Sequence, residues 1–183
     1  MLEIIVPDKE LWDEANEQFI NFHETKLELE HSLVAISKWE AKWHKPFLSK
    51  YTQKSNEEVI DYIRCMTLTP NVDQNIYKCL TKDNITQIDD YINNPMTATT
   101  IKKIQTENNN NNREQITSEL IYYWMLELKI PVEFQNWHIN RLITLIELCE
   151  VKNTPPKKLS RAEIMRRNEA INAANRKRFK SKG

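Results

Sequence analysis

Residues 116–149, ITSELIYYWMLELKIPVEFQNWHINRLITLIELC, form the longest densely apolar stretch in an otherwise polar chain. On both sides of Pro131, apolar side chains recur at three- and four-residue spacing, which is typical of one face of a helix. Proline lacks an N–H donor and disfavours helical geometry in the residue before it, so Pro131 predicts a break between two helices. The stretch therefore predicts an αα-hairpin at the centre of the fold.

The N-terminal part, residues 1–31, has the alternation expected of short strands. The run Leu2–Val6 is rich in β-branched residues and is closed by Pro7, and Thr25–Glu30 alternates strictly between apolar and polar residues. With a third apolar run at Phe19–Phe22, these segments predict a small antiparallel β-meander.

Helices are predicted between the strands and the hairpin. Ser32 predicts the start of a helix that carries Trp39 and Trp43 and stops before Pro46. Further starts are predicted at Ser55, where Glu58 completes a capping box, and at Asp73 and Asp83. The five asparagines at residues 108–112 predict a loop. Residues 32–154 are thus expected to form a helical core domain, one domain together with residues 1–31.

Residues 155–183 differ from the rest of the chain in charge. They hold ten Lys or Arg against two Glu, a net charge of +8, so residues 1–154 carry −8 within a chain of zero net charge. Ser160 and Glu163 predict a second capping box, followed by a helix with few apolar residues. The fold class predicted is mainly α (α+β), with a projecting basic C-terminal helix as an arm.

Composition excludes several classes of protein. The single glycine is Gly183, and P-loops, dinucleotide-binding loops and nucleophile elbows all need glycine in tight turns or against phosphate. Cys65, Cys79 and Cys149 are far apart and form no CxxC pair, which argues against a disulfide framework or a thiolate metal site. No membrane span or signal peptide is recognisable, so a reducing cytoplasm is the expected location.

Catalytic patterns are also lacking. His138 lies one turn before Arg141, so its imidazole is expected to be neutral and packed or hydrogen-bonded, and the four histidines do not assemble a site. The carboxylate pairs Glu57/Glu58 and Asp89/Asp90 are expected on solvated faces of short helices. We therefore expect a protein that is not an enzyme and binds no cofactor or metal.

The basic arm is the clearest functional signal, and it has two interpretations. Its cluster of Lys and Arg is typical of nucleic-acid-binding segments. The same helix is suited to an acidic helical partner or to the acidic body of a neighbouring copy. Phe179 is its single aromatic residue, which gives little support for stacking on unpaired bases.

Six segments resemble a family of siphophage proteins encoded among the tail genes, the tail assembly chaperones. They are SLVAISKWEAKWHKPF (32–47), DYIRCMTLTPNV (61–72), NNPMTATT (93–100), ITSELIYYWM (116–125), WHINRLITLIELC (137–149) and PPKKLSRAEIMRRNEAINAANRKR (155–178). The resemblance implies a helical protein of the host cytoplasm that coats the tape measure protein, keeps it soluble and helps the tail tube polymerise around it. It also implies absence from the mature virion.

The leading hypothesis is therefore a bacteriophage chaperone of siphovirus tail morphogenesis that binds the tape measure protein. The tail tube protein and a second copy of the chain are further candidate partners. The alternative is a nucleic-acid-binding or head–tail packaging accessory protein that acts through the arm. The candidate partner-binding residues are two aromatic and eight basic side chains: Trp39, Trp43, Lys157, Lys158, Arg161, Arg166, Arg167, Arg176, Lys177 and Arg178.

Overall fold

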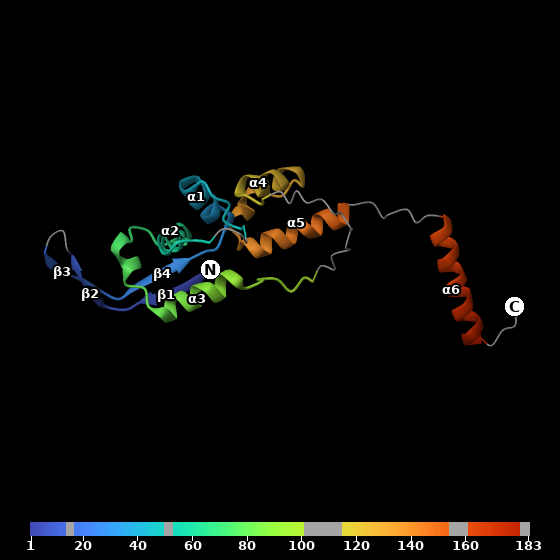
Figure 1. Ribbon diagram of the computed structural model, residues 1–183, viewed down its shortest axis with the longest axis horizontal. Coiled ribbons are helices and arrows are strands. Elements are labelled where there is room, and N and C mark those ends of the chain that lie inside the picture. The colour runs from blue at the N-terminus through green and yellow to red at the C-terminus, as the bar shows by residue number, and fades with distance from the viewer. Residues whose placement is uncertain (14–16, 50–52, 101–114, 154–160, 180–183) are drawn as a thin grey trace. The chain divides into compact units, whose positions relative to one another are not determined.

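The computed structural model describes residues 1–13, 17–49, 53–100, 115–153 and 161–179 (Figure 1). It divides into two compact units, Met1–Glu150 and Val151–Gly183. Helices dominate the described residues, and a small antiparallel β part precedes them, as the sequence predicts. No helix among the described residues is both long and apolar enough to cross a membrane.

The β part is a nested hairpin, so the predicted meander order is wrong. Strand β1 (Leu2–Val6) pairs with β4 (Thr25–Leu29), and β2 (Lys9–Asp13) pairs with β3 (Gln18–Phe22), all antiparallel. Strand β2 was not predicted, because three of the five residues in KELWD are charged. The inner hairpin β2–β3 continues beyond the outer pair in Figure 1.

Helix α1 (Leu33–Trp43) contributes five buried residues to the first unit. Ser32 caps it by accepting a hydrogen bond from the Ala35 N–H, and His44 ends it in the left-handed conformation. Its apolar side chains face the core, and Trp39 is fully buried with its Nε1–H donating to the Glu58 carbonyl at 2.9 Å. Helices α2 and α4 and the turn η2 all pack against α1.

The next elements begin at side-chain caps. Helix α2 (Asn56–Met66) has the predicted capping box of Ser55 and Glu58, and the 3-10 turn η1 (Gln74–Lys78) begins after Asp73. Helix α3 (Lys82–Asn93) is capped by Thr81 rather than by Asp83. Thr81 is the better cap because its hydroxyl oxygen accepts the Asn84 backbone N–H while the Asn84 side-chain oxygen accepts the Thr81 backbone N–H.

The predicted break at Pro131 is confirmed. Helix α4 (Ser118–Glu127) is followed by Lys129 in the left-handed conformation, and Pro131 leads into the 3-10 turn η2 (Val132–Asn136) before α5 (Ile139–Asn153). Both helices contribute buried side chains to the core: Ile121 and Met125 from α4, and Ile139, Leu142 and Ile146 from α5. The apolar stretch of residues 116–149 is thus a main part of the core, beside α1.

Glu40 joins three segments of this core. Its carboxylate is buried and accepts the Phe47 N–H and the Ser118 N–H, each at 2.7 Å. These bonds tie the end of α1 to the chain that follows it and to the start of α4. A charged acceptor of two buried N–H groups stabilises the fold more than a neutral one.

Replacing Glu40 by glutamine is expected to lower the free energy of unfolding by about 2–3 kcal/mol, because the amide keeps only one acceptor oxygen for two buried donors. Urea unfolding followed by circular dichroism measures the change. The exposed Glu57→Gln is the matched control and should stay within about 0.5 kcal/mol of the parent. Equal stability of the two variants would mean that Glu40 does not hold α4 in place.

The second unit contains helix α6 (Arg161–Phe179). Its described side chains are exposed, as expected for a sequence with few apolar residues. The capping box predicted at Ser160 and Glu163 lies outside the residues whose side chains the structure describes, and so does the asparagine run at residues 108–112.

Candidate functional site

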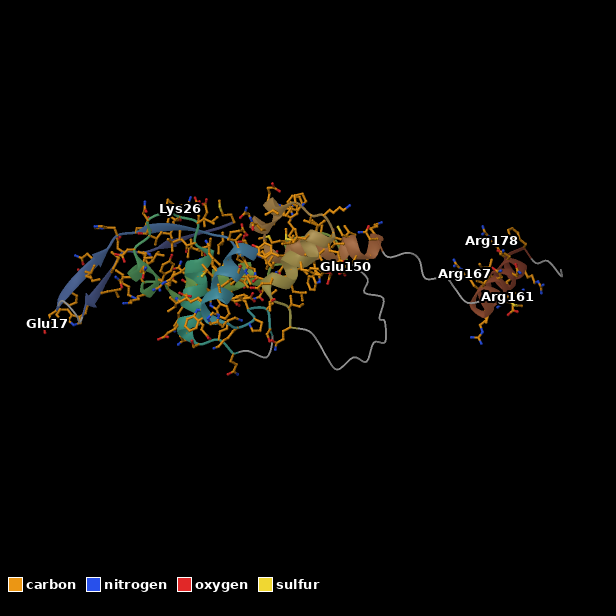
Figure 2. The ribbon with its side chains drawn as sticks, turned by 90° about the horizontal axis from the view of Figure 1, so that it is seen from above. Glu17, Lys26, Glu150, Arg161, Arg167 and Arg178 are labelled. Carbon is orange, nitrogen blue, oxygen red and sulfur yellow. The ribbon has the colours of Figure 1, made fainter. Side chains whose placement is uncertain are left out.

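Helix α6 presents a cluster of basic side chains. Arg161, Arg166, Arg167, Arg176, Lys177 and Arg178 are all exposed on this 19-residue helix. Lys157 and Lys158 lie outside the described residues. Figure 2 labels Arg161, Arg167 and Arg178 on this helix. By helical spacing Arg167 and Arg178 share one side, and Arg161 and Arg166 lie on two others. The helix therefore offers positive charge in several directions rather than one narrow stripe.

The same helix also exposes three apolar side chains along one face. Ile164, Ile171 and Phe179 recur at helical spacing, with exposed fractions of 45%, 47% and 70%. Asn168 and Asn175 lie between them on this face. A shallow open hollow lined by Asn172, Asn175, Arg176 and Phe179 borders it. Exposed aliphatic and aromatic side chains beside arginines are typical of surfaces that bind another protein.

The two tryptophans proposed as contacts do not share one environment. Trp39 is fully buried, so the prediction that it contacts a partner from the surface is wrong. Trp43 is half-buried, and its Nε1–H donates to the Asp61 carboxylate at 2.9 Å. Helices α2 and α4 cover the side of α1 that carries the tryptophans. Only part of the Trp43 side chain therefore remains exposed to solvent.

Two histidines far apart in sequence meet in the core, which the sequence did not reveal. The rings of His31 and His138 are 5.0 Å apart at the point where residues 32 and 138 form an isolated β-bridge. His31 Nδ1 shares a hydrogen bond of 2.5 Å with the Tyr62 hydroxyl. His138 donates from Nε2 to the Tyr91 carbonyl at 3.0 Å, so its Nδ1 is the nitrogen that accepts the Asn140 N–H.

Burial keeps this pair neutral. Burial, with a further contribution from the neighbouring His138, lowers the pKa of His31 from 6.5 to about 3. Burial also lowers the pKa of His138, and the hydrogen bond to the Tyr91 carbonyl offsets part of that change. The predicted neutral, hydrogen-bonded state of His138 is confirmed, and Arg141 turns away to stack on the Trp137 ring at 4.0 Å.

The carboxylates of α2 are less exposed than predicted. Glu57 is on the surface, but Glu58 is buried because it caps α2 and receives Lys45 Nζ at 2.5 Å. The hydrogen bond from Lys45 lowers the pKa of Glu58. Burial alone would raise the pKa of Asp61, but hydrogen bonds from Lys42 and Trp43 outweigh it and lower that pKa. Asp89 and Asp90 are exposed, as predicted.

These groups have structural roles. Each of these buried carboxylates and imidazoles already has a hydrogen-bond partner and lies in the core or at a capped helix end. Within the described ranges, no group of three or more His, Cys, Asp or Glu could hold a metal ion. The cysteines are free thiols, and burial raises the pKa of Cys65 and of Cys79. The exposed surface of α6 is therefore the best candidate for function.

Comparison with known proteins adds no family: no family model, curated protein or solved structure matches the chain. The function must therefore be inferred from the residues and geometry of the chain itself.

Proposed function

We propose that the protein is a non-enzymatic chaperone of phage tail assembly that holds a long helical tail protein, the tape measure protein, through helix α6. One observation carries the proposal: α6 combines six exposed basic side chains with the exposed apolar side chains Ile164, Ile171 and Phe179. An acidic amphipathic helix would cover the apolar side chains while its carboxylates meet the arginines.

The resemblance of the six segments to tail assembly chaperones supports the same function and names the partner. Two of those segments, residues 32–47 and 116–125, form α1, the chain after it and α4, which Glu40 joins in the core. The segment at residues 155–178 includes most of α6. Of the segments that carry the resemblance, these two thus belong to the core of the fold, and the segment that covers α6 is exposed.

Co-expression tests the proposal. The tape measure protein encoded beside this chain is produced alone and together with it, and the soluble fraction is measured by sedimentation and gel analysis. We expect a clear rise in soluble tape measure protein and its co-purification with the chain. A soluble fraction that does not change with co-expression would rule the proposal out.

Deletion of residues 155–183 should separate folding from binding. Because every described side chain of α6 is exposed, the melting temperature of residues 1–154 should stay within about 2 °C of that of the full chain. Thermal unfolding by circular dichroism measures this. Solubilisation of the tape measure protein should be lost. A truncated chain that melts many degrees lower yet still binds would make the arm a structural element.

A second candidate function is nucleic-acid binding by the same helix, favoured by its six basic side chains. Duplex DNA titrated at rising salt distinguishes the two. If about six phosphates were contacted, the affinity would fall about a thousandfold between roughly 50 and 200 mM salt. Under the chaperone proposal, DNA binds weakly even at low salt, and the tape measure protein competes it off completely.

A further inference from the structure

The hairpin of β2 and β3 carries an exposed aromatic pair that the fold does not use. Trp12 and Phe19 are directly opposite in the antiparallel register, and their rings pack edge to face with centroids 4.9 Å apart. Their exposed fractions are 52% and 66%. We call this exposed side of the hairpin, with Trp12 and Phe19 at its centre, the ribbon face.

The register of the hairpin explains why Trp12 and Phe19 are exposed on the same side. Because side chains alternate across a strand, Leu11 and Ile20 point to the opposite side, and both are partly buried against the core. Sheet contacts of β2 and β3 in the described chain are limited to each other. A two-stranded ribbon is marginally stable by itself, and a cover on its apolar face would stabilise it.

Charge around the ribbon face is predominantly negative. Residues 8–24 hold six Asp or Glu against Lys9, a net charge of −5 with His23 neutral. Asp8, Glu10, Glu17 and Glu24 are exposed, and Figure 2 places Glu17 at the far end of the hairpin. An aromatic centre with an acidic rim is complementary to a segment that is both apolar and cationic.

We propose that the ribbon face is a docking surface for a cationic amphipathic helix of another protein, which carries both Lys or Arg and apolar side chains. The apolar side chains would pack on Trp12 and Phe19, and a Lys or Arg would lie over the Trp12 ring. The acidic rim disfavours nucleic acid and anionic membranes as occupants. This surface goes beyond the proposed function, since α6 has the opposite charge and would take a partner of opposite sign.

Three labelled synthetic peptides test the surface with the full chain. The probe is a helix-forming peptide of Leu and Lys about five turns long. One control peptide replaces every Lys by Glu, and the other replaces every Leu by Gln and so keeps the charge without the apolar side chains. Fluorescence anisotropy gives each affinity. We expect binding of the Leu/Lys peptide and much weaker binding of the Gln peptide. The Glu peptide is an acidic helix of the kind that α6 would take, so any binding of it should be unchanged by substitutions on the ribbon face.

Variants place the binding on the ribbon face. The double variant Trp12→Ser with Phe19→Ser should weaken binding of the Leu/Lys peptide at least about tenfold. Leu126→Ser removes a similarly exposed apolar side chain from α4, 70% exposed, and should change the affinity less than about twofold. The charge reversals Glu10→Lys with Glu17→Lys keep both aromatic rings and should also weaken binding about tenfold.

The outcomes are distinct. Equal affinity of the parent chain and of both double variants overturns the proposal. Sedimentation velocity of the free chain provides a second check: if the parent self-associates and the Trp12/Phe19 variant is monomeric, the ribbon face is an interface between copies, and the proposal of a cationic partner is wrong. If Trp12→Ser with Phe19→Ser proves unfolded by circular dichroism, the Glu10/Glu17 variant decides the result.

Discussion

Replacing Trp39 by alanine is expected to lower the free energy of unfolding by about 3–5 kcal/mol. The indole is fully buried between α1 and α2, with the Phe47 ring edge-on at a centroid distance of 5.1 Å. Its removal leaves a cavity and also strips the Glu58 carbonyl of the indole N–H donor. Urea unfolding followed at the helical circular dichroism band measures the loss.

Tyr123→Ala is the control for this experiment. Tyr123 lies on α4 with an exposed fraction of 57%, so its truncation should change the stability by less than about 0.5 kcal/mol. If Trp39→Ala were as mild as Tyr123→Ala, Trp39 would have to be on the surface, and the packing of α1 against α2 would be wrong.

Acidification is expected to destabilise the fold well above the range in which carboxylates titrate. His31 has a folded-state pKa of about 3 against 6.5 when unfolded, so below pH 6.5 the unfolded chain binds a proton that the native state does not. Stability is therefore fully present above pH 6.5 and falls by about 1.4 kcal/mol per pH unit as the pH drops toward 3. The lowered pKa of His138 acts in the same direction.

Between pH 6.5 and about 5 the pH dependence of stability comes from the histidines. The lowered pKa values of Glu58 and Asp61 change the stability only at lower pH. Urea unfolding at several pH values in this interval gives the slope. His31→Gln should reduce it by about 1.4 kcal/mol per pH unit, and the exposed His23→Gln should leave it unchanged. A slope that persists in His31→Gln would mean that His31 is solvated in the native state.

The sequence correctly predicted those elements whose ends are determined by residues close to them in the chain. Strand β1 begins and ends as its β-branched run indicates, and Ser32 and the Ser55–Glu58 capping box mark the starts of α1 and α2. The break at Pro131 is equally local. Each of these features depends on backbone groups within a few residues, so the sequence pattern is sufficient to locate them.

Non-local pairing was beyond the sequence pattern. The nesting of β2–β3 inside β1–β4 depends on which strands meet across a turn, and alternation alone is the same for a meander. The meeting of His31 with His138 requires the junction before α1 to pair with the junction before α5. The burial of Glu58 follows from Lys45 and Trp39, both outside its own helix.

Of the two candidate binding surfaces, one was predicted from the sequence and the other was not. The basic side chains of α6 were predicted because charge composition alone identifies them. The pair of Trp12 and Phe19 was missed, although one signal was present: the two aromatic residues flank DEANEQ, a mostly polar segment long enough for two strand ends and a hairpin loop of about four residues. Trp39 was assigned to a contact surface because a helical stripe of tryptophans does not say which neighbour covers it.

Charge reversal with a matched control tests most directly whether α6 holds a helical tail protein through its charge. One variant changes Arg to Glu at Arg166, Arg167, Arg176 and Arg178 of α6. The control changes Lys to Glu at four exposed positions of the first unit, Lys38, Lys78, Lys82 and Lys129, and so alters the net charge equally. Each is co-expressed with the tape measure protein, and the amount that co-purifies is measured. We predict that the α6 variant loses the complex while the control retains it; equal co-purification by both variants would contradict a role for the charge of α6.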